Sequence, residues 1–117
     1  MQTSYIGKHA KLYDKFYENK DYSGEVEFLD KQIKKEIPQV NKSIKLLDMA
    51  CGTGTHVLLF EKKGYEVQGL DYSEFMIDEA RRKAQSQASQ AKFMQADMST
   101  FSLNEQKFDV ITCLFDS

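Results

Sequence analysis

The chain has 117 residues, of which 41% are hydrophobic and 29% are charged, a balance typical of one small globular domain. Its formal net charge of -2 provides no basic excess, which argues against a surface that binds a nucleic-acid backbone. No apolar run approaches the roughly 20 residues that span a bilayer, and the first residues lack the pattern of a signal peptide, so a cytoplasmic protein without membrane contact is expected.

The first predicted helix runs over about residues 24–37. Val26, Leu29 and Ile33 recur there at three- and four-residue steps, which places them on one helical face. Pro38 disfavours continuation of the helix, so we expect it to end there.

The first predicted strand covers residues 44–49, a short apolar run typical of a strand buried on both faces of a parallel sheet. A glycine turn at 52–54 follows it directly. A helix is expected next over about 57–63, with Gly64 placed for a left-handed C-cap. The chain then returns as a second strand over about 65–70.

The second half of the sequence repeats this alternation. Ser73 is a plausible N-cap with Glu74 in the first turn of a helix, which is expected to fade into the polar stretch 85–90. The basic run 81–83 is expected on the solvated face of this helix. Residues 92–96 are predicted as the third strand.

Residues 108–115 form an apolar run that predicts the fourth strand. Strands that alternate with helix-length segments favour right-handed βαβ crossovers. The predicted fold class is therefore α/β, with a doubly wound parallel sheet.

Acidic side chains stand near the ends of three predicted strands, at Asp48, Asp71 and Asp97. Gly52 and Gly54 in the first strand-to-helix turn let the backbone approach a ligand closely. A carboxylate that ends the neighbouring strand can accept both hydroxyls of a ribose, and ligands of open parallel sheets bind beyond the carboxyl ends of the strands. These positions predict a site for a nucleoside-type cofactor.

The motifs in this order resemble those of the Rossmann-like S-adenosylmethionine-dependent methyltransferases. Residues 48–54 resemble the family's first motif, an acid followed by alternating small residues, with Ala50 where the first glycine usually stands. Asp71 resembles the acid that holds the ribose hydroxyls. The likeness is most specific between residues 46 and 114.

The third and fourth strands carry the remaining motifs of the resemblance. Residues 96–98 resemble the motif in which the carboxylate, here Asp97, takes the adenine amino group and the next amide, here that of Met98, meets the ring. Residues 108–113 resemble the motif whose last residues, here Cys113, lie under the methionine moiety of the cofactor.

The aromatic N-terminal segment looks like the lid of a subset that acts on small molecules, among them the amino-sugar N-methyltransferases and the glycine methyltransferase type. Residues 1–40 are expected to form this helical lid, with Tyr13 and Tyr22 closing over the cofactor. The cofactor-binding residues that the resemblance implies are Tyr13, Tyr22, Ala50, Gly52, Gly54, Asp71, Tyr72, Met76, Asp97, Met98 and Cys113.

The resemblance implies S-adenosyl-L-methionine as the cofactor and a small-molecule acceptor with a nitrogen or oxygen nucleophile. A sulfonium already makes the methyl group electrophilic, so the protein chiefly has to orient the acceptor, and no protein nucleophile is needed. No catalytic base is named. The implied strand order is 3-2-1-4.

Residues 1–117 are expected to be a single, incomplete domain, with 41–117 as the cofactor-binding half of the sheet. The outer edge of the fourth strand would then be unpaired, which favours self-association. Methyl transfer is expected to be impaired in this short form.

Two other functions remain open. A nicotinamide-dependent oxidoreductase also joins a glycine turn to a later acid, but its third glycine would fall where this chain has Val57. A non-catalytic cofactor-binding module is the other alternative, because fold does not fix function. RNA modification is disfavoured by the charge balance.

The individual polar residues also have simpler interpretations. Asp71 could be a turn acid before an N-cap, and Asp97 could start a loop. Asp48 either holds the glycine turn through backbone amides or touches the cofactor. The arginines and lysine of 81–83 are not interpreted as a nucleic-acid patch.

The cysteines and histidines predict neither a disulfide framework nor a metal site, because their number and spacing are wrong for both. Cys51 and Cys113 are expected to be small buried residues. His9 and His56 are expected to be packing or surface residues rather than a catalytic base.

Overall fold

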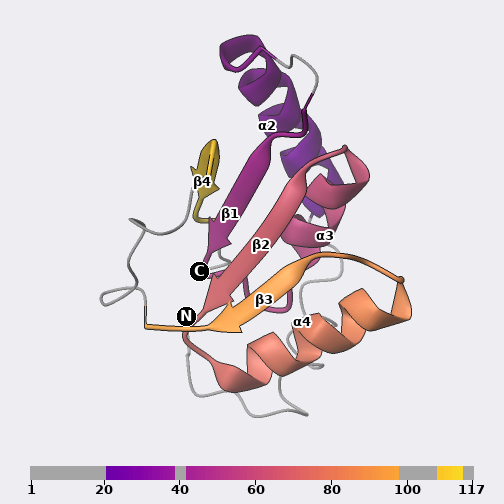
Figure 1. Ribbon diagram of the computed structural model, residues 1–117, viewed down its shortest axis with the longest axis vertical. Helices are drawn as coiled ribbons and strands as arrows, with labels where there is room; N and C mark the ends of the chain where they lie inside the picture. The colour runs from indigo at the N-terminus through magenta and orange to yellow at the C-terminus, as the bar shows by residue number, and fades with distance from the viewer. Residues whose placement is uncertain (1–20, 39–41, 98–107, 115–117) are drawn as a thin grey trace.

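The computed structural model describes residues 21–38, 42–97 and 108–114. The elements in chain order are α2 (Tyr22–Glu36), β1 (Lys45–Met49), α3 (Thr55–Lys62), β2 (Glu66–Asp71), α4 (Glu74–Ser86), β3 (Lys92–Gln95) and β4 (Val110–Thr112). The strands pair in parallel in the order β3-β2-β1-β4, shown in Figure 1. This confirms the predicted α/β class and strand order.

The helices α3 and α4 lie on one face of the sheet. Both connections, β1 to β2 and β2 to β3, step across the sheet in the same direction, so right-handed crossovers place both helices on the same side. Helix α2 packs against α3 (Figure 1). The buried apolar side chains between these layers are Val26, Ile44, Leu46, Cys51, Val57, Leu58, Phe60, Tyr65, Val67, Ile77, Ala80, Ala84 and Phe93.

The ring of Phe93 fixes the distance between the sheet and the glycine turn. A Cβ atom built on Gly69 of β2 or on Gly54 of the turn would lie 2.8 Å from this ring. That separation is too short for real carbon atoms, so both positions need the absence of a side chain. The turn after β1 therefore lies directly on the core.

Helix α2 ends where its sequence predicts, before Pro38, but it begins at Tyr22, two residues before the predicted start. The Asp21 carboxylate accepts the Gly24 amide at 2.9 Å and caps the helix, and the last turn stops at Ile37, just before Pro38. Val26 is buried on its inner face. The part of the predicted lid over residues 1–20, with Tyr13, lies outside the described residues.

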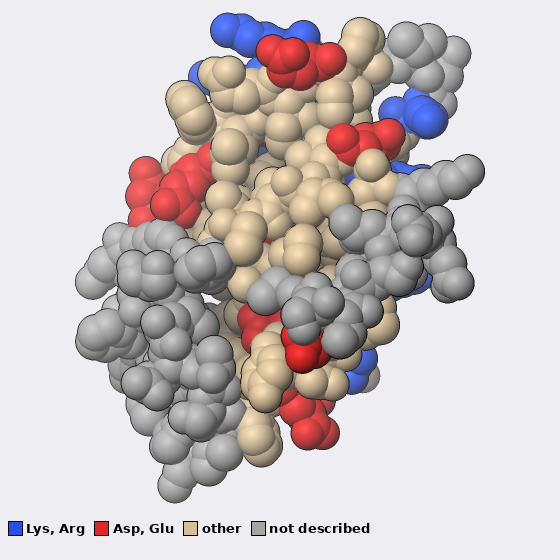
Figure 2. Space-filling view, turned by 90° about the vertical axis from the view of Figure 1, so that its left-hand side faces the viewer, with Lys and Arg blue, Asp and Glu red and all other residues tan. Residues whose placement is uncertain are grey.

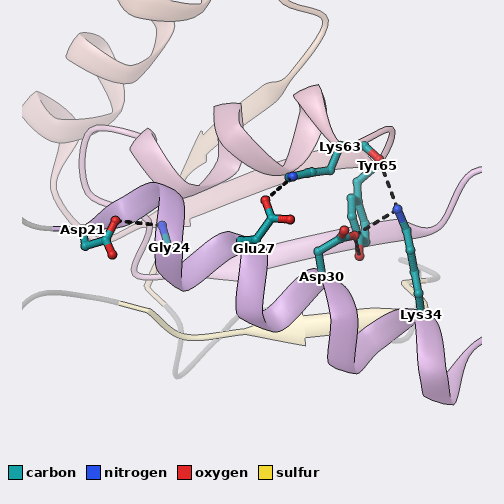
Figure 3. A network of polar contacts seen from close by, with 7 residues as sticks. All are labelled: Asp21, Gly24, Glu27, Asp30, Lys34, Lys63 and Tyr65. Atoms are coloured by element: carbon teal, nitrogen blue, oxygen red, sulfur yellow. Dashed lines mark hydrogen bonds and ion pairs between the residues drawn. The ribbon is translucent and has the colours of Figure 1, made fainter.

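A polar network joins α2 to the end of α3 and the start of β2 (Figure 3). The Tyr65 hydroxyl donates to Asp30 at 2.8 Å, and the Lys34 ammonium lies 3.0 Å from the same oxygen. Lys34 also donates to the carbonyl of Lys63, whose ammonium pairs with Glu27. Burial alone would raise the pKa of Asp30, but the hydrogen bonds from Tyr65 and Lys34 hold it below its usual value. The network fixes α2 near the amino ends of the strands.

Helix α4 starts as predicted. The Ser73 hydroxyl accepts the Met76 amide at 3.2 Å, and Glu74 lies in the first turn. The prediction that the whole basic run 81–83 faces solvent is wrong for Lys83, which is only half exposed. Its ammonium turns inward to the glycine turn, since two hydroxyl groups there accept its hydrogen bonds.

Within the described residues, β4 covers only Val110–Thr112 of the predicted 108–115, and residue 115 lies outside them. The Leu114 amide leaves the ladder because it donates to the Asp48 side chain at 3.3 Å. Cys113 is exposed, so the expectation that it is buried is wrong, whereas Cys51 is buried as expected. The position of Cys113 just after a short outer strand explains its exposure.

None of the helices in the described part of the chain has the length and apolar character of a membrane-spanning segment.

Candidate functional site

The turn after β1 adopts a left-handed backbone at three places. The φ angles are +60° at Ala50, +58° at Gly52 and +85° at Gly54. Left-handed backbone costs an alanine roughly 1–2 kcal/mol, so a glycine would be less strained at position 50. This is the position where the resembling motif usually has its first glycine.

The carboxylate of Asp71 joins the glycine turn to the start of α4. One oxygen accepts the Gly52 amide at 2.8 Å, and the other accepts the Ser73 amide at 2.8 Å. Asp71 is 7% exposed. It does act as the turn acid of the simpler interpretation, but each oxygen keeps a further lone pair that can accept a ligand hydroxyl.

Main-chain hydrogen bonds bring the end of β3 to the same place. The Ala96 amide donates to the carbonyl of Asp71 at 2.9 Å, and the Cys51 amide donates to that of Leu70 at 2.8 Å. Asp97 is the next residue and is exposed. The glycine turn, Asp71 and Asp97 therefore lie together at the carboxyl edge of the sheet.

In the contacts described, Asp48 does not hold the glycine turn through backbone amides, which was one of the two roles that the sequence left open. One carboxylate oxygen accepts the Thr112 hydroxyl at 2.8 Å and the Leu114 amide at 3.3 Å, so it holds the end of β4. The other oxygen has no hydrogen-bond partner among the described residues. Burial, with a smaller contribution from the nearby charge of Asp71, raises the pKa of Asp48 to about 7.

The first residues of α2 and α3 are in direct contact. The rings of Tyr22 and His56 meet edge to face with centroids 4.8 Å apart, and His56 Nε2 lies 2.7 Å from Glu25 Oε1. His56 is buried, which agrees with the expected packing role. Because His56 follows the glycine turn closely, this contact places Tyr22 beside the carboxyl edge.

The remaining predicted residues have different surroundings. Tyr72 is exposed at the same edge, and its carbonyl accepts the Gln95 side chain at 2.9 Å. Met76 is fully buried in the first turns of α4. Cys113 follows β4 and is exposed, as noted above. Met98 lies outside the described residues.

An open hollow of about 740 Å³ lies at the opposite edge of the sheet. Lys45, Glu66 and Lys92, which begin β1, β2 and β3, are among the residues that line it. It is therefore separate from the glycine turn. In the residues described, no group of three or more His, Cys, Asp or Glu gathers as metal ligands.

Sequence reasoning missed Lys83 and Glu25 as contacts of this region. Lys83 lies 30 positions from Thr53, and Glu25 lies 31 positions from His56. A single sequence carries no signal for such pairs, because they arise only when the helices pack together.

Comparison with known proteins is consistent with this arrangement. A family model described as "Methyltransferase domain" matches residues 46–116. The dTDP-3-amino-3,4,6-trideoxy-alpha-D-glucopyranose N,N-dimethyltransferase of Streptomyces venezuelae is 36% identical over 111 residues, which are 93% of this chain and 44% of that protein. The dTDP-3-amino-3,6-dideoxy-alpha-D-glucopyranose N,N-dimethyltransferase of Streptomyces fradiae is 36% identical over 99% of this chain and 43% of its own length. The chain thus spans less than half the length of these relatives.

Solved structures give the same similarity. The crystal structure of Streptomyces venezuelae DesVI superposes with a TM-score of 0.77 at 36% identity, over 95% of this chain and 44% of that one. An S-adenosylmethionine-bound amino pentose methyltransferase from Micromonospora echinaspora superposes with a TM-score of 0.72 at 28% identity, over 98% of this chain and 44% of that one.

Proposed function

The chain belongs to the Rossmann-like S-adenosylmethionine-dependent methyltransferase family, and from this premise we propose that its carboxyl edge binds S-adenosyl-L-methionine for methyl transfer to a small-molecule acceptor. The observation that carries the proposal is the hydrogen bond between Asp71 and Gly52, which makes the acid and the glycine turn one unit. The similarity to dTDP-amino-sugar N,N-dimethyltransferases supports an amine on a sugar as the acceptor.

The residues of this edge fit the chemical groups of the cofactor. Asp71 can accept ribose hydroxyls, because Gly52 and Ser73 each occupy only one lone pair of its two oxygens. Asp97 is exposed and follows Ala96, whose amide donates to the Asp71 carbonyl. Its carboxylate is assigned to the adenine amino group. The backbone of Gly52 and Gly54 is assigned to the methionine moiety, while the missing side chain of Gly54 makes room for the Phe93 ring.

The other predicted residues keep their roles as part of the proposal. Tyr72 borders Asp71 at the exposed edge, and Tyr22 is held near the turn by His56. Ala50, Met76 and Cys113 are assigned to the walls of the site, and Tyr13 and Met98 complete the set.

The bound cofactor would supply a methyl group on a positively charged sulfur, which is electrophilic without further activation. The chain's own residues then have to bind the adenosyl group, orient the acceptor along the line of transfer and exclude water. This division of labour needs no protein nucleophile. An acceptor amine has to arrive unprotonated or lose its proton to a base, and no residue is assigned to that step.

A nicotinamide-dependent oxidoreductase is disfavoured by Val57. This residue stands where the third glycine of the dinucleotide fingerprint would be, and its side chain is fully buried in the core between α3 and the sheet. The third glycine of the fingerprint allows the helix to pack closely on the strand, and the Val57 side chain prevents this close packing here.

Calorimetric titration separates these functions. We expect S-adenosylhomocysteine to bind the chain and NAD to give no heat of binding. Binding of NAD in place of S-adenosylhomocysteine would establish the oxidoreductase alternative. Binding of S-adenosylhomocysteine without methylation of any compound in a broad panel of small-molecule acceptors would favour a non-catalytic module.

The proposal also includes self-association through β4. Among the described residues β4 pairs only with β1, so its other edge presents unpaired backbone groups. Figure 2 shows a broad area of uncharged residues on the side of the molecule where β4 lies in Figure 1, and Ile111 of β4 is 46% exposed. Light scattering should show a dimer whose population falls when Ile111 is replaced by lysine; a monomer at all concentrations would contradict this part.

A further inference from the structure

We propose that Lys83 is a positioning residue for the cofactor turn, an inference that rests on the proposed function. Its ammonium group donates to the hydroxyl of Thr53 at 3.2 Å and to that of Thr55 at 2.9 Å. These two threonines flank Gly54. One side chain of α4 thus holds both sides of the glycine around which the turn bends.

An anchor stabilises the turn because ordering its two glycines costs conformational entropy. Gly52 and Gly54 adopt left-handed conformations, and glycine loses more conformational entropy on ordering than other residues. The main-chain bond from the Gly54 amide to the Cys51 carbonyl, at 3.0 Å, closes the turn but does not tie it to the rest of the fold. Lys83 supplies a tie to a helix.

Helix α4 contacts the turn at two points one helical turn apart. A Cβ atom built on Gly54 would lie 3.2 Å from the Cβ of Ala80, so the two residues are in close contact. Lys83 follows Ala80 by three positions and lies on the same helical face. Asp71, just before α4, holds the other end of the turn through Gly52. The turn is therefore clamped between Asp71 and Lys83.

Lys83 lies in the last turn of α4, where the helix dipole favours a cation, but its ammonium group reaches the amino end of α3. Thr55 is the first residue of α3, and the amino end of a helix carries a partial positive charge that repels an ammonium group. No acidic residue lies in the first turn of α3 to offset this repulsion. A role in fixing the turn accounts for a cation there, because the threonine oxygens accept its hydrogen bonds.

The test compares Lys83→Met, Lys83→Arg and Lys62→Met. Lys62→Met is the matched control, because it removes one positive charge from an exposed position of α3. Calorimetry with S-adenosylhomocysteine should show about tenfold weaker binding for Lys83→Met, the effect of one lost charge-assisted contact. Lys83→Arg, which keeps the donors, and Lys62→Met should bind as the unchanged chain does.

Amide hydrogen exchange gives a second readout that does not need the cofactor. Lys83→Met should speed exchange at residues 52–55 and leave the amides of β1 protected. On a Thr53→Val, Thr55→Val background, Lys83→Met should have no further effect on affinity or exchange. An equal effect on that background, or unchanged exchange at the turn, would overturn the inference.

The two proposals fail in different ways. If the unchanged chain bound no S-adenosylhomocysteine, the proposed function would be wrong, and unchanged turn exchange in Lys83→Met would separately refute the anchoring role. If the chain bound it and Lys83→Met bound it equally well, only the inference about Lys83 would be wrong.

Discussion

The carboxylate of Asp71 accepts the backbone amide of Gly52 at 2.8 Å, although the two residues lie 19 positions apart in the sequence. The acid ends β2, and the glycine lies in the turn after β1. The bond joins the two motifs that separately indicated a nucleoside site. Changes at either residue should therefore affect the same binding event.

Replacement of Asp71 by asparagine should weaken binding of S-adenosylhomocysteine by at least about tenfold, because hydrogen bonds to a charged group contribute about 1.5–3 kcal/mol each. An amide offers one acceptor oxygen in place of two, so either Gly52 or Ser73 loses its partner. Calorimetric titration measures the change. Asp78→Asn, an exposed position on α4, is the control and should bind normally.

Asp48 should make stability depend on pH in a defined direction. Its pKa in the folded chain is about 7, raised from an ordinary value of 3.8, so between these values the folded chain binds more protons than the unfolded chain. The free energy of unfolding therefore contains a contribution that is complete below about pH 4 and is lost as the pH rises through 7.

Asp48→Asn removes this contribution because asparagine does not ionise. Urea unfolding from pH 4 to pH 8 should show the difference between the unchanged chain and Asp48→Asn falling by on the order of 4 kcal/mol. Groups other than Asp48 titrate in both chains, so their effects cancel in the difference between the two free energies of unfolding. A difference that stays constant with pH would show that Asp48 does not titrate in this range.

Two glycine substitutions should separate backbone strain from crowding. Gly64→Ala at φ +98° meets no atom within 4 Å and should cost only the left-handed penalty, roughly 1–2 kcal/mol. Gly54→Ala at φ +85° also drives its Cβ to 2.8 Å from the Phe93 ring and should cost about 3 kcal/mol or more. Equal losses in thermal unfolding would mean that the turn can move away from Phe93.

Tyr65→Phe should lower stability without changing cofactor affinity. It removes the hydroxyl that donates to Asp30 at 2.8 Å, in the network of Figure 3, which should cost about 1–2 kcal/mol. This network lies near the amino ends of the strands, away from Asp71. Unfolding in urea and calorimetry on the same sample check both parts, and a loss of affinity comparable to that of Asp71→Asn would argue against the separation of the two edges.

Local signals in the sequence were sufficient for most of the fold. Ser73 and Pro38 act on their own neighbours, and the apolar run at β1 reflects burial on both faces, so these elements are where the sequence predicted them. The strand order followed from the family resemblance. The carboxyl-edge placement of Asp71 and the glycine turn followed from parallel pairing.

The features that were not predicted depend on contacts between distant residues. The Thr112 hydroxyl donates to the Asp48 carboxylate across 64 positions, and the Leu114 amide donates to the same oxygen. These two hydrogen bonds hold the end of β4. The inward turn of Lys83 depends on how α4 lies over Thr53 and Thr55. No local pattern encodes such pairs, because either side chain alone is compatible with a solvated position.

An amide-resolved nuclear magnetic resonance titration of the chain with S-adenosylhomocysteine tests the cofactor site directly. We expect the amide signals of Gly52, Ser73 and Asp97 to shift together with one dissociation constant, while those of Lys45, Glu66 and Lys92 at the opposite edge do not move. Shifts confined to the opposite edge, or no shifts at saturating ligand, would contradict the assignment of the carboxyl edge as the cofactor site.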